Sequence, residues 1–329
     1  MVEDFLNKKN STRNLSEDSF KKILPTLAEE LSNVDYHYFY NDKELLKDWD
    51  KLKKFETEET FTASTVRVGM KLCEYFFPNF FKIKNNKGES FNDFWNKENL
   101  QKVLKWNRSS HSTPYLSELR RGVYFCNGLT KNTMYRPHIA KMICDFYKPK
   151  RVLDPCSGWG GRLLGATSSN IEYVGFETNK ETYNNLLKLI HYLNLENLIT
   201  MYNNGSENMN FQEEFDLVIT SPPYFDLEVY SDEETQSENM FSSYEEWVNG
   251  WLTLVIEKSL KALKKDGVSC WNTHSIGNYK LIDDVKNIHE KNGFHLDKEF
   301  GLVSSSRQAN QNNNKNKKTV DLTMCFIKD

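Results

Sequence analysis

The sequence predicts an α/β protein with a doubly wound, mostly parallel seven-stranded sheet and a reversed edge strand, preceded by a mainly helical region. Three observations lead to this prediction. Short apolar segments alternate with helix-like segments from residue 150 onward, a pattern typical of βα units. Two of these segments stop abruptly, one in a glycine-rich loop and one at paired prolines. Residues 1–120 instead carry apolar residues at helical spacing.

Seven segments are short, apolar and bounded by turn residues, as strands are. They lie near residues 151–154, 172–176, 199–202, 215–220, 267–273, 293–303 and 319–327. Residues 139–147 and 244–265 have helical patterns, and residues 264–267 form a turn that leads into the fifth strand. The last two strands are expected to form an antiparallel hairpin.

The helical region has its own start signals. Ser16 precedes an apolar-periodic run, in which Pro25 is expected to kink or divide the helix. Ser90 is expected to cap a second helix with apolar residues up to Val103. We interpret these aromatic-rich stripes as core. The predicted division is therefore a helical region over 1–120 and a second domain over 121–329.

The strand over residues 215–220 ends in Ser221, Pro222, Pro223 and Tyr224. Two prolines remove two backbone donors and fix two φ angles, so the chain must turn there. A rigid corner at the carboxyl end of a strand is where open α/β sheets bind ligands. A hydroxyl, free carbonyls and a flat ring suit an amino group on an extruded nucleobase. The alternative is an ordinary Pro-Pro turn, since serine and proline are common turn residues.

A second junction spans residues 151–162, where a strand runs into Asp154, a glycine-rich turn and the start of a helix. Glycines allow the backbone to approach a ligand closely. The next strand ends in Glu177, about twenty residues later, where an acid can accept both hydroxyls of a ribose. Asp154 beside an α-amino group and Glu177 on a ribose would fit S-adenosylmethionine. Either acid could instead be a helix cap or a solvated loop residue.

Residues 135–329 resemble the catalytic domain of the DNA amino-methyltransferases, which methylate exocyclic amines with S-adenosylmethionine. Residues 154–160 are similar to the family's Asp-Pro-Phe-x-Gly-x-Gly loop, with Cys156 in place of the aromatic residue. Residues 219–224 resemble the signature of the branch that modifies the 4-amino group of cytosine. The resemblance implies the class I methyltransferase fold.

The resemblance also implies roles for individual residues. It places cofactor binding at Tyr135, Arg136, Pro137, Asp154, Cys156, Ser157, Gly158, Gly160, Glu177 and Ser206. Ser206 stands where the family often has an acid that binds the adenine amine of the cofactor. The implied catalytic residues are Ser221, Pro222, Pro223 and Tyr224. The position of Cys156 in the cofactor turn argues against a role as the nucleophile of carbon-5 methylation.

The expected reaction is direct methyl transfer to the amine. Acceptors at Ser221 Oγ and the Pro222 carbonyl would hold the amine hydrogens and favour tetrahedral geometry. Tyr224 would stack on the extruded base. Neither a metal nor a covalent intermediate is required. His274 at a strand end is interpreted as structural, with a proton relay as the alternative.

The formal net charge is −3, but the charges are unevenly distributed. Residues 101–165 contain 12 basic and three acidic residues, which favours contact with DNA phosphates. The leading candidates are Arg108, Arg120, Arg121 and Lys131, with Arg307 and Lys315 in a second basic segment over 304–318. A solvated charged face is the alternative for both segments.

Bulk properties exclude other classes. The mean hydropathy is −0.68, and no apolar run approaches the ~18 residues of a transmembrane helix. The chain opens with acidic residues rather than a signal peptide, and its six cysteines show no disulfide or zinc spacing. These features predict a cytoplasmic protein with reduced thiols, associated with the nucleoid in a prokaryotic or viral context.

Three functions remain open from the sequence. The first is methylation of the 4-amino group of cytosine in a flipped-out base of double-stranded DNA. The second is the same chemistry on the 6-amino group of adenine, whose enzymes more often have Asn or Asp at the position of Ser221. The third is a non-catalytic module that binds DNA or a partner. Sequence recognition is expected in the N-terminal region, with residues 226–246 and 303–318 as alternatives.

Overall fold

The computed structural model describes residues 5–6, 11–85, 87–129, 132–227, 229–231, 233, 235–274, 279–303 and 319–329. They fall into two compact units. The helical unit comprises Met1–Tyr38, Pro78–Thr133 and Asp226–Tyr230. The sheet unit comprises Phe39–Phe77, Met134–Phe225 and Ser231–Asp329. The units therefore interleave along the chain, whereas a single boundary near residue 120 was expected.

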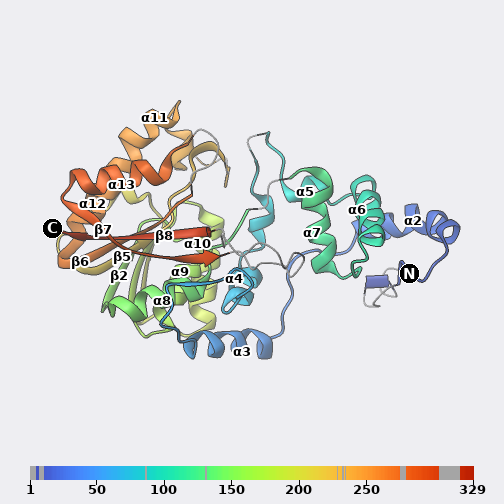
Figure 1. Ribbon diagram of the computed structural model, residues 1–329, viewed down its shortest axis with the longest axis horizontal. Helices are drawn as coiled ribbons and strands as arrows, with labels where there is room; N and C mark the ends of the chain where they lie inside the picture. Colours follow the sequence, from blue (N-terminus) through green and yellow to red (C-terminus); the bar gives the residue numbers. More distant parts are fainter. Residues whose placement is uncertain are drawn as a thin grey trace, which may run out of the picture. The chain divides into compact units, whose positions relative to one another are not determined.

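One eight-stranded sheet, with the order β1-β7-β8-β6-β5-β2-β3-β4, forms the centre of the sheet unit (Figure 1). Its strands are β1 (Phe61–Ala63), β2 (Arg151–Asp154), β3 (Glu172–Phe176), β4 (Ile199–Tyr202), β5 (Phe215–Thr220), β6 (Leu263–Asn272), β7 (Phe294–Val303) and β8 (Thr319–Lys328). All seven strands predicted from the sequence are present. The predicted fold class, a doubly wound and mostly parallel sheet, is confirmed.

The reversed strand lies inside the sheet and not at its edge. β8 pairs antiparallel with both β6 and β7, so the predicted hairpin of the last two strands is present. Met324, Cys325 and Phe326 of β8 are fully buried, as a central strand covered on both faces requires. The edge is instead β1, which pairs parallel with β7. Three residues are too short to produce a recognisable alternation.

The turn predicted over residues 264–267 is absorbed into β6. Leu263 pairs with Phe215 and Val268 with Leu217, so the intervening residues form a bulge in the strand. A bulge keeps the strand in the sheet while it accommodates extra residues. Their polar side chains are exposed at Lys264 and Lys265, which explains why their sequence resembles a turn.

Helices cover both faces of the sheet (Figure 1). One group contains α8 (Pro137–Tyr147), α9 (Gly161–Thr167) and α10 (Lys180–Tyr192). The opposite group contains α11 (Tyr244–Trp247), a π-helical turn over Val248–Leu252, α12 (Thr253–Ala262) and α13 (Leu281–Lys291). Trp247 and Val255, on the predicted apolar side of the second group, are fully buried in a core that includes Phe215 and Trp271.

The stretch between residues 39 and 77 supports the sheet unit, although the sequence assigned it to the helical region. It contains α3 (Asp42–Lys53), α4 (Met70–Phe76) and β1. Thr62 of β1 forms a 3.0 Å hydrogen bond with the buried His138 of α8. Only these tertiary contacts reveal the assignment, because the local pattern is helical in both units.

The helical unit contains α2 (Glu17–Ser32), a 3₁₀ turn (Pro78–Lys82), α5 (Phe91–Phe94), α6 (Lys97–Ser109) and α7 (Leu116–Asn127). Ser16 caps α2 as predicted, and Pro25 lies within that helix without dividing it. The helix predicted from Ser90 is two helices. Asn96 accepts from the N–H of Asn99 at 3.1 Å and so starts α6 anew, because an N-cap asparagine stabilises a helix start.

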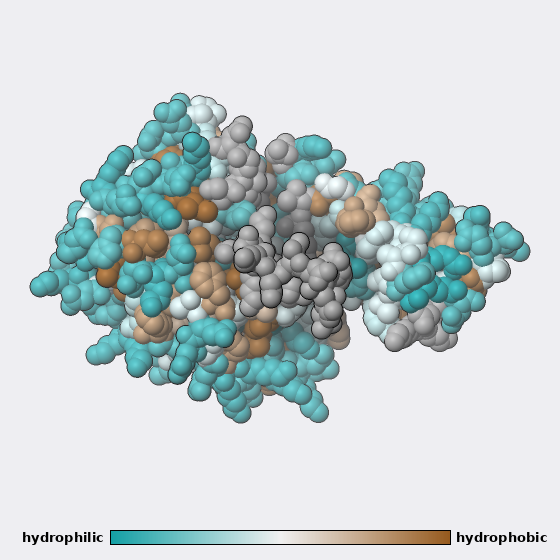
Figure 2. Space-filling model, viewed as in Figure 1, coloured by the Kyte–Doolittle hydropathy of each residue, from teal (hydrophilic) through white to brown (hydrophobic). Residues whose placement is uncertain are grey.

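The surface seen in Figure 2 is mostly hydrophilic, with smaller hydrophobic patches between the polar side chains. Within the ranges described above, no helix is long and apolar enough to cross a membrane.

Candidate cofactor and catalytic site

The predicted site residues follow three neighbouring parallel strands. β2 pairs with β3 and with β5, so the carboxyl ends of these strands lie along one edge of the sheet. Asp154 ends β2, Glu177 follows β3 and Ser221 follows β5. The structure therefore brings both sequence motifs to the edge at which open α/β sheets bind ligands.

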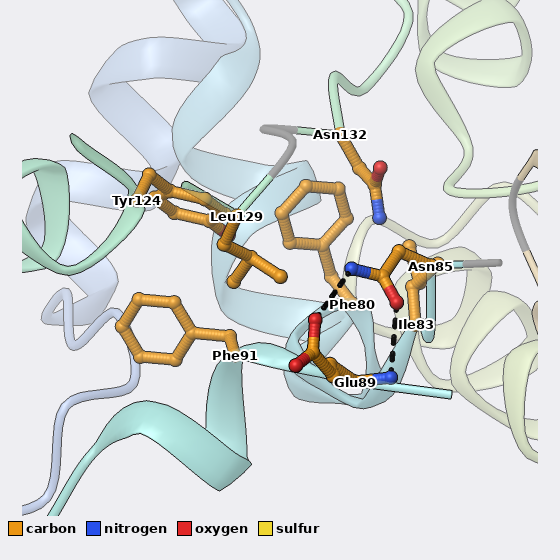
Figure 3. A pocket seen from close by; sticks show the side chains of 8 residues that line it. All are labelled: Phe80, Ile83, Asn85, Glu89, Phe91, Tyr124, Leu129 and Asn132. Atoms are coloured by element: carbon orange, nitrogen blue, oxygen red, sulfur yellow. Dashed lines mark hydrogen bonds between the residues drawn. The ribbon is translucent and has the colours of Figure 1, made fainter. Parts of the chain in front are cut away.

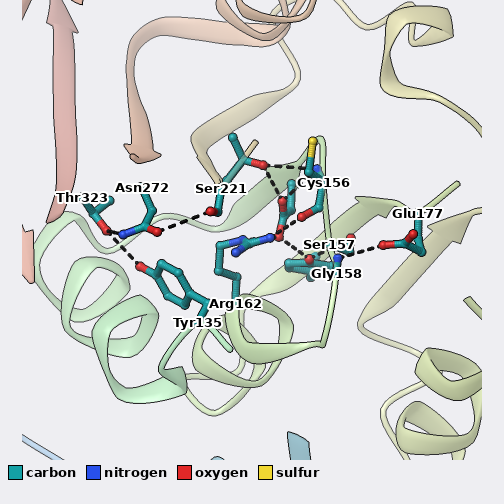
Figure 4. Close-up of polar contacts among 12 residues, drawn as sticks. Tyr135, Cys156, Ser157, Gly158, Arg162, Glu177, Ser221, Asn272 and Thr323 are labelled. Carbon is teal, nitrogen blue, oxygen red and sulfur yellow. Dashed lines mark hydrogen bonds and ion pairs between the residues drawn. The ribbon is translucent and has the colours of Figure 1, made fainter. Parts of the chain in front are cut away.

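Asp154 is the centre of a buried hydrogen-bond network whose other members include Cys156 and Arg162, both labelled in Figure 4. Its carboxylate is fully buried and accepts from Thr220 Oγ1 at 2.8 Å and from Tyr173 OH at 2.7 Å. The N–H of Cys156 adds a third bond at 3.1 Å. Protein donors thus surround the carboxylate. Through these bonds Asp154 connects the glycine-rich loop over residues 154–160, named here the cofactor loop, to β3 and β5. The sequence had suggested instead that the Asp154 carboxylate lies beside the α-amino group of the cofactor.

Arg162 completes this network, and the sequence analysis did not single it out. Its Nε lies 2.7 Å from Asp154 Oδ2, and both side chains are almost completely buried. A second nitrogen donates to the Cys156 carbonyl. Burial alone would lower the pKa of Arg162, but the Asp154 carboxylate raises it above its ordinary value. Arg162 therefore keeps its charge, and the ion pair fixes the loop between β2 and α9.

The glycine-rich turn has a conformation that requires glycine. Gly160 has φ 72° and forms the N-cap of α9, in the left-handed region that other residues rarely adopt. A Cβ added at Gly161 would lie 2.2 Å from the Tyr135 carbonyl oxygen. The turn is thus packed directly against residues 134–138, which the resemblance had linked to the cofactor.

The side chains of that segment are mostly turned inward. Tyr135 is buried, with its OH 3.2 Å from Thr323 Oγ1 and its ring 5.0 Å from the Arg162 guanidinium. Arg136 donates to the carbonyls of Ser64 and Val66, and burial lowers its pKa. Pro137 is a buried first residue of α8. These contacts fix residues 135–137 next to the glycine-rich turn.

Glu177 joins the end of β3 to the glycine-rich turn. Its two carboxylate oxygens accept from the N–H groups of Gly158 and Asn179, each at 2.9 Å. Burial raises the pKa of Glu177 to about 7, although these two N–H groups act to lower it. Glu177 therefore lies beside the glycine-rich turn, and its predicted role as acceptor of the ribose hydroxyls stays a prediction.

Tyr202, the last residue of β4, and Ser206, which follows that strand, lie at the same edge of the sheet. Tyr202 ends β4 with 41% of its surface exposed, and its ring stacks on Phe176 with centroids 4.9 Å apart. Ser206 is only 3% exposed, and its hydroxyl has no hydrogen-bond partner among the described residues. A buried polar atom without a partner is costly and needs explanation, and a ligand polar atom would satisfy it.

Cys156 and Ser157 both lie in the loop over residues 154–160. Burial, assisted by Asp154, raises the pKa of the Cys156 thiol, which opposes formation of the reactive thiolate. Ser157 is buried and its Oγ lies 3.0 Å from Tyr173 OH, within hydrogen-bond distance. The structure therefore agrees with the interpretation that Cys156 is not a nucleophile.

Hydrogen bonds connect the corner after β5 (residues 221–224) to residues of β6 and β8. Ser221 Oγ donates to Asn272 Oδ1 at 3.3 Å. Figure 4 shows this bond between Ser221 and Asn272. Asn272 Nδ2 in turn donates to the carboxylate of Asp321 and, at 3.0 Å, to the carbonyl of Leu322. Burial raises the pKa of Asp321, while Asn272 and Arg136 act to lower it. Asn272 and Asp321 escaped the sequence analysis because neither belongs to a recognisable motif.

The rest of the corner is rigid. Pro222 is buried, Pro223 is partly exposed, and the partly buried Tyr224 packs against the core of the sheet unit. The next residue, Phe225, has φ 55°, a left-handed conformation that costs about 1–3 kcal/mol for such a residue. Its ring lies among Tyr244, Trp247 and Tyr279. This packing holds the strained backbone, which in turn orients Tyr224.

The predicted phosphate contacts are placed differently from expectation. Arg120 is 9% exposed and donates to the Tyr36 carbonyl at 2.8 Å. Arg108 donates to the backbone of residues 12 and 15. Both arginines therefore hold the helical unit together. Arg121 is exposed beside Glu118, whereas Lys131, Arg307 and Lys315 lie outside the described residues.

A small hollow in the helical unit is lined by Phe80, Ile83, Asn85, Glu89, Phe91, Tyr124, Leu129 and Asn132 (Figure 3). Asn85 Nδ2 donates to Glu89 Oε2 at 3.1 Å, and Glu89 N donates to Asn85 Oδ1 at 3.0 Å. These two polar side chains satisfy each other, so the hollow needs no ligand to pair them.

Comparison with known families covers the sheet unit. A family model described as DNA methylase matches residues 215–329. A second, described as N-6 DNA methylase, matches residues 128–267. Between them the two matches include both strand-end motifs. No curated protein sequence matches the chain.

Solved structures show more distant likenesses. TrmN from Thermus thermophilus has 15% identity and a TM-score of 0.41, over 58% of this chain and 48% of that one. An S-adenosylmethionine-dependent O-methyltransferase from Thermotoga maritima has 12% identity and a TM-score of 0.42, over 63% and 70%. The chain spans about half the length of the TrmN structure. We draw no functional argument from these similarities.

The sheet order, the glycine-rich turn after β2 and the acid after β3 define a class I S-adenosylmethionine-dependent methyltransferase. Within that class, the two family-model matches indicate the N6/N4 DNA methyltransferase family. The predicted family, enzyme class and cofactor are therefore confirmed.

Proposed function

We propose that this enzyme methylates the 4-amino group of cytosine in double-stranded DNA, on a base rotated out of the helix. The observation that carries the proposal is the Ser221 corner, which lies at the same sheet edge as the cofactor loop. A serine before Pro-Pro-Tyr resembles the signature of the cytosine branch. The hydrogen bond from Ser221 to Asn272 supports an ordered hydroxyl at this position.

The residues at this edge fit S-adenosylmethionine. Each Glu177 oxygen accepts only one protein N–H and so keeps a lone pair with which it would accept a ribose hydroxyl, whereas the Asp154 carboxylate already accepts four bonds. The buried and unpartnered hydroxyl of Ser206 would pair with a polar atom of the adenine ring, and Tyr202 offers a partly exposed face beside it. Asp154 and Tyr135 would act by shaping the loop, since their polar groups are already bonded within the protein.

The cofactor, when bound, supplies a methyl group on a positively charged sulfur, which becomes a neutral thioether as the methyl–nitrogen bond forms. The protein's part is to prepare the amine. Ser221 Oγ and the Pro222 carbonyl would accept its two hydrogens and favour a tetrahedral nitrogen, which frees the lone pair. The methylated, positively charged nitrogen then loses one proton to solvent water. Tyr224, fixed by the packed corner, would stack on the base.

Adenine is the second candidate. It is favoured by the match of the N-6 DNA methylase model, which includes the Ser221 corner. The geometry required at an exocyclic amine is the same for both bases. Non-catalytic binding is not supported, because both matching family models describe DNA methylases and the strand-end motifs are assembled in the structure.

We propose that the helical unit contributes to DNA recognition through the exposed side of α6 and α7. Lys102, Lys105 and Arg121 are exposed on these helices. Phe125 is 71% exposed and its ring centroid lies 5.5 Å from that of Trp106. Cations attract phosphates and exposed rings can stack on bases. This surface, named here the α6–α7 surface, takes the place of Arg108 and Arg120 as the candidate DNA contact.

The test is to incubate the purified chain with S-adenosylmethionine and double-stranded DNA, digest the DNA and identify the methylated nucleoside by mass spectrometry. We expect 4-methylcytosine, and Ser221→Ala should reduce its amount on the order of 100-fold. Methyladenine would support the second candidate instead. A folded protein that binds the cofactor but methylates neither base would contradict both.

A further inference from the structure

The proposed role of Ser221 leaves one requirement open. A serine hydroxyl is both a donor and an acceptor. To hold an amine hydrogen, Ser221 Oγ must present a lone pair to the substrate, so its own hydrogen must point elsewhere. A hydroxyl that is free to rotate would spend part of its time with its hydrogen directed at the amine, which opposes methyl transfer.

Asn272 can take that hydrogen. It ends β6, the parallel neighbour of β5, and is 5% exposed. Its Oδ1 lies 3.3 Å from Ser221 Oγ. An amide oxygen can only accept, so in this contact the serine must donate. The hydrogen of Ser221 is then engaged inside the protein.

The orientation of the Asn272 amide follows from its other contacts. Nδ2 faces the Leu322 carbonyl at 3.0 Å and the carboxylate of Asp321. A backbone carbonyl has no hydrogen to donate, and an ionised carboxylate has none either. A flipped amide would place its oxygen against both of them. The oxygen of Asn272 therefore points to Ser221 because β8 accepts from its nitrogen.

We propose that Asn272 and Asp321 are positioning residues for methyl transfer, which fix the Ser221 hydroxyl so that its lone pairs face the target amine. The inference rests on the proposed role of Ser221. Asp321 also places a negative charge at the end of this chain of hydrogen bonds. Bonds in such a chain polarise one another, which strengthens Ser221 as an acceptor while the amine becomes positive.

The experiment measures single-turnover methylation at saturating DNA and cofactor. Asn272→Ala should lower the rate by up to about 100-fold, as misplacement of a reacting group does. Asp321→Asn keeps an acceptor but removes the charge, and should lower the rate about tenfold. Both variants should bind S-adenosylmethionine within about twofold of the wild type, which also shows that they are folded. The matched control is Asn292→Ala, since Asn292 caps α13 next to the start of β7, and its rate should be unchanged.

A double variant separates positioning from general support. If Asn272 acts through Ser221, Ser221→Ala with Asn272→Ala should be no more than about twofold slower than Ser221→Ala alone, because residues that act as a unit are not additive. Equal losses in both backgrounds would overturn the proposal and give Asn272 a structural role. A wild-type rate for Asn272→Ala would also overturn it. A wild-type rate for Ser221→Ala would instead contradict the proposed function itself, so the two failures are distinguishable.

Discussion

The strand-end site and the basic stretch over residues 101–165 were both predicted from local sequence patterns. The structure brings the residues of the first together but separates those of the second. At the strand ends, Asp154, Glu177 and Ser221 reach one edge of the sheet. The basic stretch is divided between the helical unit and the sheet unit. Two of its members, Arg120 and Arg162, are buried in different units.

The difference has a physical cause. The ends of parallel strands must converge, because the sheet hydrogen bonds fix their relative positions. Nothing fixes the relative position of charges that are merely neighbours in sequence. A helix surface distributes them around its axis, and some of them then serve to hold other backbone groups. A motif at a strand end is therefore better evidence of a site than a run of like charges.

The largest expected effect is on stability, at Arg162. Arg162→Met would leave the buried Asp154 carboxylate without its charge partner, which should lower the free energy of unfolding by about 3–5 kcal/mol. Urea unfolding of the two proteins measures it. Arg121→Met removes an exposed pair with Glu118, and there the change should be about 0–1 kcal/mol. Equal effects at the two arginines would erase the contrast between buried and surface cations.

The second prediction concerns the pH dependence of cofactor binding. The pKa of Glu177 is about 7, and a carboxylate that accepts ribose hydroxyls must be ionised. Affinity for S-adenosylmethionine should therefore rise as the pH increases from 6 to 8. Glu177→Gln should weaken binding by about 1.5–3 kcal/mol at pH 8 and remove the pH dependence. Calorimetric titration at several pH values measures both.

The same pKa has a consequence for folding. It is raised from 4.5 to about 7 in the folded protein, so ionisation is easier in the unfolded chain. Glu177 should therefore reduce the stability of the ligand-free protein as the pH rises from 4.5 to 7. Glu177→Gln should remove that part of the loss. If pH affects the variant and the wild type alike in both experiments, Glu177 is not the group responsible.

The third prediction concerns capture of the base. Tyr224→Ala removes the ring that would stack on it and should cost about 1–3 kcal/mol in binding of DNA with an intact target pair. The penalty should be smaller when the target base is mispaired, because extrusion then costs less. Competition binding with matched and mismatched duplexes provides the measurement. An equal loss on both duplexes would indicate that Tyr224 supports the corner but does not hold the base.

The smallest effect concerns the α6–α7 surface. Lys102→Ala, Lys105→Ala and Arg121→Ala together should reduce the slope of log affinity against log salt by up to about 2.7, if each contacts one phosphate. The matched control is Lys148→Ala with Lys150→Ala, from the same basic stretch but before the start of β2, where the slope should not change. If the control pair changes the slope and the triple variant does not, DNA contacts the region of Lys148 and Lys150 and not the α6–α7 surface.

The sequence was sufficient to predict seven of the eight strands, the glycine-rich loop after β2 and the resemblance to the family. Strands such as β2 and β5 are short apolar runs that are soon followed by proline or glycine, and these local signals do not depend on distant contacts. The position of Glu177 after β3 was also predictable, since the length of one βα unit sets its separation from the glycine-rich turn.

Tertiary structure alone decided the features that depend on pairing across the chain. β1 is a strand only because β7 is beside it. The polar groups of Asp154 face the protein because Arg162 and Tyr173 pack against them. Asn272 and Asp321 meet Ser221 because β8 enters the sheet beside β6. Burial and hydrogen-bond partners are properties of the packed molecule, and a single segment of sequence does not contain them.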